Sequence, residues 1–224
     1  MARIRQTDQL EVWTSKFGQD YTDRNPIDVD KMDRELGEYC GAGLKSNLFR
    51  QFLSPERIHR GRVLEVGSNV GVQLKILQKV NPTLELYGLE PMEYAIDKGR
   101  STYPDIHFTQ GTAFDIPFED NSFDVVMTNT VLIHIHPNDL PGALSEIHRV
   151  CRRYIHFHEY YADALTEIRY HGRAGLLWKA NFMQCYMELF PGLTCVEVRY
   201  LHYQDSADQL PLVDQVVLLE KKAL

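Results

Sequence analysis

The sequence has little of what membrane, secreted or nucleic-acid-binding proteins show. No apolar run reaches membrane-spanning length, and the first residues, MARIRQTDQLEVW, contain no signal-peptide core. The net charge is −7, whereas binding to DNA or RNA needs a basic face. No two cysteines form a CxxC pair, which favours reduced thiols at Cys40, Cys151, Cys185 and Cys195. We therefore expect a cytoplasmic protein without a membrane or nucleic-acid partner.

The length and composition fit one ordinary globular domain. With 224 residues, of which 44 % are hydrophobic and 25 % charged, the chain is long enough for a substantial core. Residues 1–60 show no strand pattern, and we expect them to form a helical cover or lid. Residues 61–224 then form the main domain, within one compact unit. The sequence leaves the oligomeric state open.

From residue 61 onward, apolar strand patterns alternate with helical ones. Strands are expected over 62–66, 84–90, 106–111, 123–129, 153–160, 193–201 and 213–221. Helices are expected over 72–80, 92–101, 138–150 and 176–190. Strands that alternate with helices indicate a parallel sheet covered on both faces. The predicted fold is α/β: Rossmann-like and doubly wound, with a mostly parallel seven-stranded sheet.

The stretch RVLEVGSNVGVQL, residues 62–74, reads as a strand, a glycine loop and a helix. A dinucleotide fingerprint needs a glycine where Asn69 stands and a last glycine one position after Gly71. A phosphate-binding P-loop needs Gly-Lys-Ser/Thr, which is absent here. Glu65 would repel phosphates but suits a ligand that carries an ammonium group. The loop therefore predicts a nucleoside ligand without a pyrophosphate.

Two further acids follow in the order expected for such a ligand. Glu90 ends the second strand, 19 residues after Gly71, where an acid can accept both ribose hydroxyls. Asp115 and the backbone near Thr112 and Ala113 follow the third strand and could reach an adenine edge. The carboxyl ends of the strands are the usual ligand side of an open α/β sheet.

These motifs, together with IPFEDNSFDVVMTNTVLIHIHP, resemble the class I S-adenosylmethionine-dependent methyltransferases over roughly residues 61–160. The resemblance implies S-adenosylmethionine as cofactor and a small-molecule acceptor. Many relatives have an acid where Thr112 stands, and Asp115 is expected to replace it. The implied cofactor residues are Glu65, Gly67, Ser68, Asn69, Gly71, Glu90, Pro91, Thr112, Ala113, Asp115 and Asn129.

A narrower resemblance spans nearly the whole chain. FGQDYTDRN, VLIHIHPNDL, RRYIHFHEYYAD and IRYHGRAGLLWKANF are similar to the methyltransferases associated with pseudaminic acid biosynthesis. That resemblance implies a small polar acceptor without identifying it.

Methyl transfer from a sulfonium needs positioning and exclusion of water, and a base only where the acceptor loses a proton. His134 after the fourth strand and Glu159 at the end of the fifth are the candidate catalytic residues. The alternatives are a structural histidine and an ion pair of Glu159 with Arg152, Arg153 or Arg169. No metal is expected, because His134 and His136 lack a third ligand at a defined spacing.

The acceptor-binding candidates are polar and aromatic residues around the same edge. A cluster of arginine and histidine suits an anionic acceptor, although a solvated surface loop is the alternative. O-methylation is slightly favoured. N-methylation of a small amine and a non-catalytic cofactor-binding partner are the other hypotheses. The candidates, some of which could belong to a lid with Phe17, are Tyr21, Arg24, Asn25, Tyr160, Tyr161, Tyr170, His171, Arg173 and Lys179.

Overall fold

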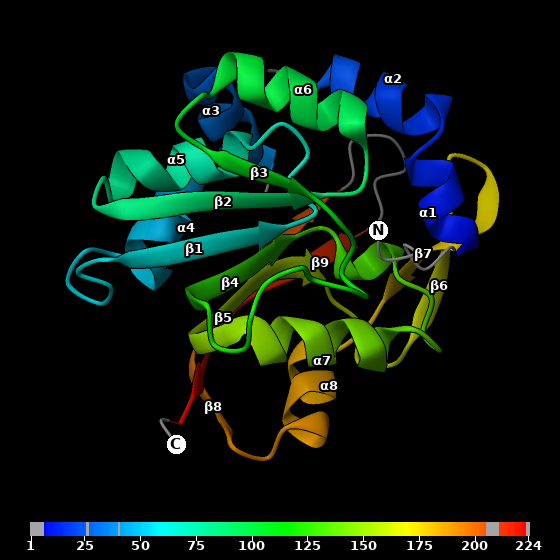
Figure 1. Ribbon diagram of the computed structural model, residues 1–224. Coiled ribbons are helices and arrows are strands. Elements are labelled where there is room, and N and C mark those ends of the chain that lie inside the picture. The colour runs from blue at the N-terminus through cyan, green and yellow to red at the C-terminus, as the bar shows by residue number, and fades with distance from the viewer. Residues whose placement is uncertain (1–6, 26, 40, 205–210, 223–224) are drawn as a thin grey trace.

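The computed structural model describes residues 7–25, 27–39, 41–204 and 211–222 (Figure 1). The expectations for the first six residues and for Cys40 lie outside these ranges. Four helices precede the sheet: α1 (Asp8–Trp13), α2 (Lys16–Arg24), α3 (Val29–Tyr39) and α4 (Lys45–Phe52). The remaining helices are α5 (Val72–Val80), α6 (Glu93–Thr102), the short 3-10 helix η1 (Leu132–His134), α7 (Leu140–Val150) and α8 (Phe182–Leu189).

The central sheet has seven strands in the order β3-β2-β1-β4-β5-β9-β8. They are β1 (Gly61–Val66), β2 (Leu84–Glu90), β3 (His107–Gln110), β4 (Phe123–Asn129), β5 (Cys151–Tyr160), β8 (Leu193–Gln204) and β9 (Pro211–Lys221). The first five pair in parallel, whereas β9 runs antiparallel to both β5 and β8. The predicted doubly wound, mostly parallel seven-stranded sheet is confirmed.

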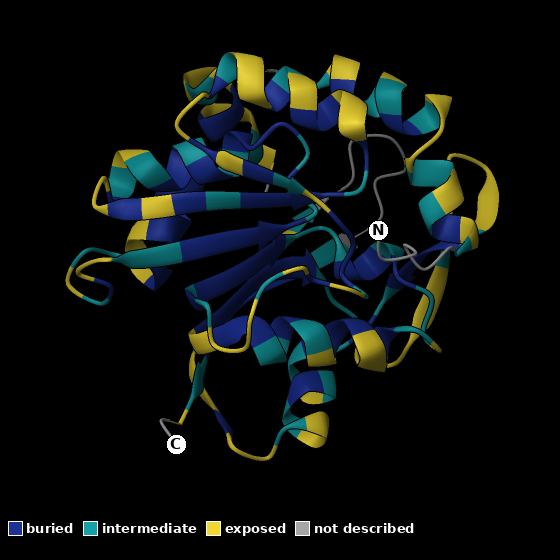
Figure 2. Cartoon of the chain, in the orientation of Figure 1, coloured by how far each residue is buried: buried dark blue, intermediate teal, exposed yellow. Residues whose placement is uncertain are grey.

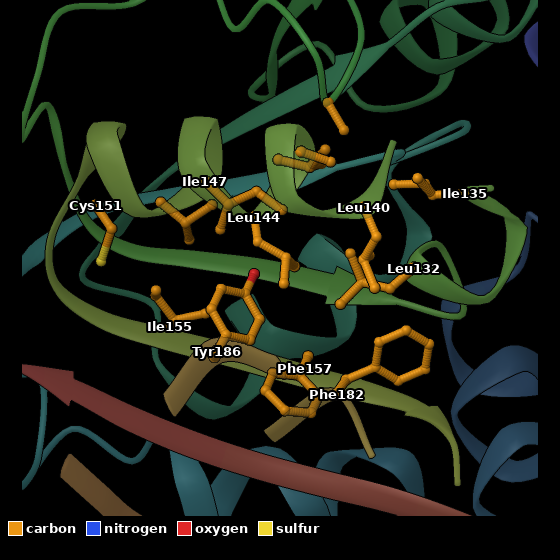
Figure 3. Packing of buried hydrophobic residues seen from close by; sticks show 14 of the residues in the cluster. Leu132, Ile135, Leu140, Leu144, Ile147, Cys151, Ile155, Phe157, Phe182 and Tyr186 are labelled. Atoms are coloured by element: carbon orange, nitrogen blue, oxygen red, sulfur yellow. The ribbon is translucent and has the colours of Figure 1, made fainter. Parts of the chain in front are cut away.

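Alternation along the strands divides the core into two layers. In β1, Val63 contacts the layer that contains α3, α4 and α5, whereas Leu64 and Val66 contact the opposite layer with α7 and α8. Figure 2 shows the strands buried between these helices. Figure 3 shows the second layer, where Leu144 and Ile147 of α7 face Phe157 of β5. Because α3 and α4 pack into this core, only α1 and α2 are left to lie over the ligand edge.

The helix expected over residues 176–190 begins later than predicted. Residues 173–179 form strand β7 (Arg173–Lys179), which pairs with β6 (Thr166–Tyr170) in a separate two-stranded sheet. The turn between them contains His171 and Gly172, both with positive φ (49° and 77°), as a tight hairpin requires. Helix α8 begins only after Asn181, whose side chain accepts a hydrogen bond from the Gln184 amide. A short apolar run such as Leu176–Trp178 suits a buried strand and a helix equally well.

Within the described ranges, no helix is both long enough and apolar enough to cross a bilayer.

Candidate functional site

A cavity lies at the carboxyl ends of β1, β2 and β4, beneath α1 and α2. Its empty space, including the open mouth, is about 940 Å³. The sheet side contributes Gly67, Asn69, Glu90, Pro91, Met92, Gly111, Thr112, Ala113, Phe114, Asn129, Thr130, Val131, His134 and Ile135. The covering side contributes Thr7, Gln9, Leu10, Trp13, Gly18 and Tyr21.

The glycine loop is shaped by left-handed backbone at three positions. Gly67, Asn69 and Gly71 have φ values of 72°, 48° and 83°. A Cβ atom on Gly67 would lie 2.6 Å from Val131, and one on Gly71 would lie 2.8 Å from Phe108. Both glycines are therefore required by sterics as well as by backbone conformation. The loop turns sharply after β1 and brings its backbone to the cavity wall.

Glu90 presents a buried carboxylate to the cavity. Its Oε2 accepts a hydrogen bond from the Asn69 amide at 3.0 Å, and its Oε1 accepts one from the Met92 amide at 3.1 Å. Burial raises the pKa of Glu90 to about 7, and these two amides offset part of that rise. Each oxygen keeps a lone pair, so the group can accept hydrogen bonds from two hydroxyls of a ligand.

Glu65 lies behind the loop with one oxygen unpaired. Its Oε1 accepts a weak hydrogen bond from Asn129 Nδ2 at 3.3 Å, whereas Oε2 is buried without a partner. Burial raises the pKa of Glu65 to about 8, while Asn129 and Lys45 act in the opposite direction. A buried acceptor without a partner is costly. A ligand ammonium would supply the missing donor and ionise the carboxyl.

His134 faces the cavity as a neutral imidazole. Its Nδ1 lies 2.7 Å from the Leu176 carbonyl, so Nδ1 carries the proton and Nε2 is left as an acceptor. Burial lowers the pKa of His134 to about 4. The rings of Trp13 and Tyr170 lie 4.6 and 5.1 Å from the His134 ring. The residue can therefore accept a hydrogen bond from a ligand that enters between α1 and the hairpin.

The central segment is similar to a known family. Residues 64–168, just under half of the chain, match the family model of a methyltransferase domain. Two curated relatives are a probable phthiotriol/phenolphthiotriol dimycocerosates methyltransferase of Mycobacterium ulcerans and an uncharacterized methyltransferase of Schizosaccharomyces pombe. The first is 34 % identical over 59 % of this chain and 50 % of its own length. The second is 31 % identical over 41 % of this chain and 36 % of its own length, so the chain spans half or less of either relative.

Solved structures carry the same fold over more of the chain. A Burkholderia thailandensis 1,6-didemethyltoxoflavin N1-methyltransferase, solved with its substrate and S-adenosylhomocysteine, covers 99 % of this chain and 93 % of its own. Its TM-score is 0.65 at 16 % identity. The PH0226 protein of Pyrococcus horikoshii covers 91 % of this chain and 99 % of its own, with a TM-score of 0.63 at 16 % identity.

The residues around the cavity fit S-adenosylmethionine as a cofactor, because Glu90 could accept hydrogen bonds from ribose hydroxyls and Glu65 Oε2 could accept one from an ammonium. Of the expected cofactor residues, Gly67, Asn69, Glu90, Pro91, Thr112, Ala113 and Asn129 line the cavity. Glu65 in β1 and Ser68 and Gly71 in the loop are buried and are not part of the lining.

Asp115 does not lie where an adenine contact requires it. Its side chain is exposed, and the lining nearby is formed by Thr112, Ala113 and Phe114. Thr112 itself is buried, and its Oγ1 accepts a hydrogen bond from the Phe114 amide at 3.2 Å. The backbone of this loop, without an acidic side chain, is what faces the ligand here.

Glu159 fits neither of its two expected roles. The side chain is fully buried outside the lining, and its carboxylate accepts hydrogen bonds from the Val131 and Ile133 amides at 3.1 and 3.4 Å. The arginines named as alternative partners have other contacts: Arg152 pairs with Asp124, Arg153 pairs with Glu220, and Arg169 donates to the Gly172 carbonyl at 3.4 Å. Glu159 instead holds η1, the turn that carries His134. Its pKa is raised to about 7, chiefly by burial.

The expected acceptor residues are only partly brought together. Tyr21 lines the cavity, Asn25 hydrogen-bonds to it, and Tyr170 lies against His134. Lys179 stacks over Tyr160 at 5.9 Å, and Tyr161 lies against Tyr200, both away from the lining. The remaining candidates, which are exposed on α2 and on the hairpin turn, are Arg24, His171 and Arg173.

The expected helical cover includes α1, but no residue of α1 was named as part of the cavity wall. Trp13 and Leu10 of α1 line the cavity, and Gln9 Nε2 donates to the Gly175 carbonyl of β7 at 2.9 Å. In α2, Thr22 accepts a hydrogen bond from Asn69 Nδ2 at 2.9 Å. These contacts fasten α1 to the hairpin and α2 to the glycine loop. The three apolar residues of this short helix, Leu10, Val12 and Trp13, were the available signal.

Proposed function

We propose that this protein transfers a methyl group from S-adenosylmethionine to a small polar acceptor. The observation that carries the proposal is a pair of buried carboxyls at the same edge of the sheet: Glu90, which lines the cavity and has two free lone pairs, and Glu65, which lies outside the lining beside Asn129 and has an unpaired oxygen. Together they match a ribose diol and an ammonium held at the two ends of one nucleoside. A nicotinamide dinucleotide lacks that ammonium and carries phosphates, which these carboxylates would repel.

When bound, S-adenosylmethionine supplies an electrophilic methyl group on sulfur. The chain's own part is to position the acceptor behind that methyl group and to exclude water. Trp13 and Tyr21 line the cavity, and Tyr170 lies against Trp13, so these aromatic rings are suited to both tasks. His134 Nε2 is an acceptor at this mouth, able to orient an acceptor hydroxyl or amine and to take its proton.

The acceptor we favour is a small polar metabolite, with oxygen slightly preferred over nitrogen. The relatives whose names state an acceptor methylate phthiotriol dimycocerosates, a phytyl naphthoquinone and didemethyltoxoflavin, which are all small molecules. Arg24, His171 and Arg173 are exposed on α2 and the hairpin, and such side chains favour an anionic acceptor. The narrower resemblance to methyltransferases associated with pseudaminic acid biosynthesis points to the same chemistry. A small amine is the alternative acceptor.

Calorimetry tests the cofactor half of the proposal. S-adenosylmethionine and S-adenosylhomocysteine should both bind, whereas NAD should not. Tight binding of NAD without a response to S-adenosylhomocysteine would overturn the assignment.

The acceptor half needs a panel of hydroxy acids and small amines, incubated with S-adenosylmethionine and analysed by mass spectrometry for a gain of one methyl group. His134→Ala should depress turnover of a true acceptor and leave the affinity for S-adenosylhomocysteine nearly unchanged. If His134 acts as a base, the loss should shrink as the pH rises and more acceptor ionises unaided. Turnover equal to that of the wild type in this variant would show that the acceptor does not bind beside His134.

A further inference from the structure

A buried polar chain lies directly behind the cavity wall and is not used by the steps above. Lys45, the first residue of α4, is 2 % exposed. Its Nζ donates to Asn129 Oδ1 at 2.9 Å and lies 2.6 Å from His158 Nδ1. On the other side of the His158 ring, Nε2 lies 2.7 Å from Asp214 Oδ2. Tyr203 donates to the second Asp214 oxygen at 2.7 Å.

The donors and acceptors in this chain have one consistent arrangement. The Lys45 ammonium can only donate, so His158 Nδ1 accepts and Nε2–H donates to Asp214. For the same reason the Asn129 carbonyl points to Lys45, and its NH₂ group points to Glu65 Oε1 at 3.3 Å. The orientation of the Asn129 amide is therefore set by Lys45, which is in turn held by His158.

Backbone strain marks the place where this chain meets the cavity. Thr130, the residue after Asn129, has a φ of 52°, which is rare for a β-branched side chain. Its amide donates to the His158 carbonyl at 2.9 Å, and its side chain lines the cavity. Strain of this kind persists where the surrounding structure holds it, and it is concentrated at ligand sites.

We propose that Lys45, His158 and Asp214 are positioning residues that hold Asn129 and Glu65 in the orientation needed by the methionyl end of the cofactor. The inference rests on the proposed function, because it assumes that this end of the cavity receives an ammonium. Lys45 contacts Asn129, His158 contacts Lys45, and Asp214 contacts His158, and none of the three lines the cavity. They come from α4, β5 and β9, so a strand two places away from β4 contributes to the orientation of Asn129.

The arrangement depends on a neutral His158. The charged and titratable groups around it are Lys45, Asp214 and His156, and Lys45 also faces Glu65. Burial and Lys45 lower the pKa of His158, and Asp214 opposes them, so the ring is neutral at pH 7. A second proton, on Nδ1, would set two cations 2.6 Å apart and drive Lys45 from Asn129. Acidification below the ordinary histidine range should therefore loosen the methionyl end alone.

Two ligands that differ only at that end provide the test. S-adenosylhomocysteine carries the amino-acid moiety, whereas 5′-methylthioadenosine lacks it. Lys45→Met and His158→Leu should each weaken S-adenosylhomocysteine about tenfold and leave 5′-methylthioadenosine within about twofold. His158→Gln should restore the wild-type ratio, because an amide can accept from Lys45 and donate to Asp214.

The matched control is His156→Leu. His156 is equally buried on the same face of β5, but its Nδ1 contacts the Val217 carbonyl and it does not touch Asn129. It should leave the ratio of the two affinities unchanged. Equal weakening of both ligands in the His158 variants, or a ratio that stays at the wild-type value, would overturn the proposal.

A wild-type protein that binds neither ligand would contradict the proposed function instead. The positioning role would then be decided by the side-chain amide signal of Asn129 in ¹⁵N NMR, assigned from Asn129→Asp. That signal should shift in His158→Leu and not in His156→Leu. An unchanged signal in both would overturn the inference.

Discussion

Glu90 is the residue whose substitution best separates cofactor binding from folding. Glu90→Gln should weaken S-adenosylhomocysteine by roughly 10- to 100-fold, as expected for loss of charged hydrogen bonds of about 1.5–3 kcal/mol. In calorimetry, an affinity equal to that of the wild type would remove Glu90 from the site.

The same substitution should stabilise the ligand-free protein at pH 8. Burial raises the pKa of Glu90 to about 7, above its unfolded value near 4.3, so between these pH values the unfolded chain is ionised while the folded protein keeps the proton, and stability falls. Removing the carboxyl should stabilise by roughly 1–3 kcal/mol at pH 8 and by little at about pH 4, where both states hold the proton. Thermal unfolding at the two pH values checks both the sign and the window.

Glu65 should make cofactor affinity depend on pH. Its pKa is about 8 in the ligand-free cavity, whereas an ammonium ligand requires the ionised form. Binding therefore releases a proton, and the affinity for S-adenosylhomocysteine should rise between pH 6 and pH 8, by up to about tenfold per unit. Glu65→Gln should bind more weakly and flatten this part of the profile. A steep profile that persists in Glu65→Gln would point to another group.

For single residues, the sequence predicted positions that follow from the order of strands and helices. It missed roles that depend on tertiary packing. The spacing from Gly71 to Glu90 follows from one strand and one helix, so the ribose-facing acid could be found. Glu159 stands at a strand end in the sequence, but β5 runs far enough into the core for η1 to cover its carboxylate. Lys45 lay in a segment without any strand pattern, and nothing in the sequence indicated that α4 reaches Asn129.

Among the elements, α1 and α2 are the ones expected to respond to the cofactor. Their contacts with the rest of the molecule are a few polar bonds, such as Gln9 to Gly175 and Asn69 to Thr22, and aromatic contacts around Trp13. Their amides should exchange with solvent quickly in the ligand-free protein and slowly with S-adenosylhomocysteine bound. The amides of α7, which is packed in the core, serve as the internal control. If the amides of α1 and α2 exchange equally slowly with and without the ligand, these helices do not respond to the cofactor.

The hairpin of β6 and β7 shows why elements outside the repeating pattern are harder to predict. The parallel strands could be found because each is a continuous apolar run bounded by turns and helices. The stretch 166–179 is half exposed, and its apolar part joins directly to that of α8, so periodicity favoured one long helix. What fixes the strand is tertiary: Leu176 accepts from His134, and Gly175 accepts from Gln9.

In the whole molecule, two sets of buried groups with opposite pKa shifts determine how stability depends on pH. Three carboxyls have raised pKa values: about 8 for Glu65 and about 7 for Glu90 and Glu159. From about pH 4.3 upward the unfolded chain ionises these groups, whereas the folded protein keeps their protons until the pH reaches the raised pKa values, so stability falls across that range and levels off above it. Four imidazoles have lowered pKa values, which are about 4 for His134 and His148, about 3 for His156 and below the usual range for His158.

The imidazoles act on the acid side. Below about pH 6.5 these imidazoles take up protons in the unfolded chain but not in the folded protein, so stability falls. Below about pH 5 the carboxyls of the unfolded chain also begin to take up protons. Near pH 6 the two sets nearly balance, so the ligand-free protein should be most stable there and less stable at both pH 4.5 and pH 8.5. S-adenosylhomocysteine should move this maximum upward, because it binds Glu65 and Glu90 in their ionised forms and removes most of the loss on the alkaline side. Unfolding by urea at each pH, with and without the ligand, measures the shift. A maximum that stays at the same pH when the ligand is bound would mean that neither carboxyl changes its protonation on binding.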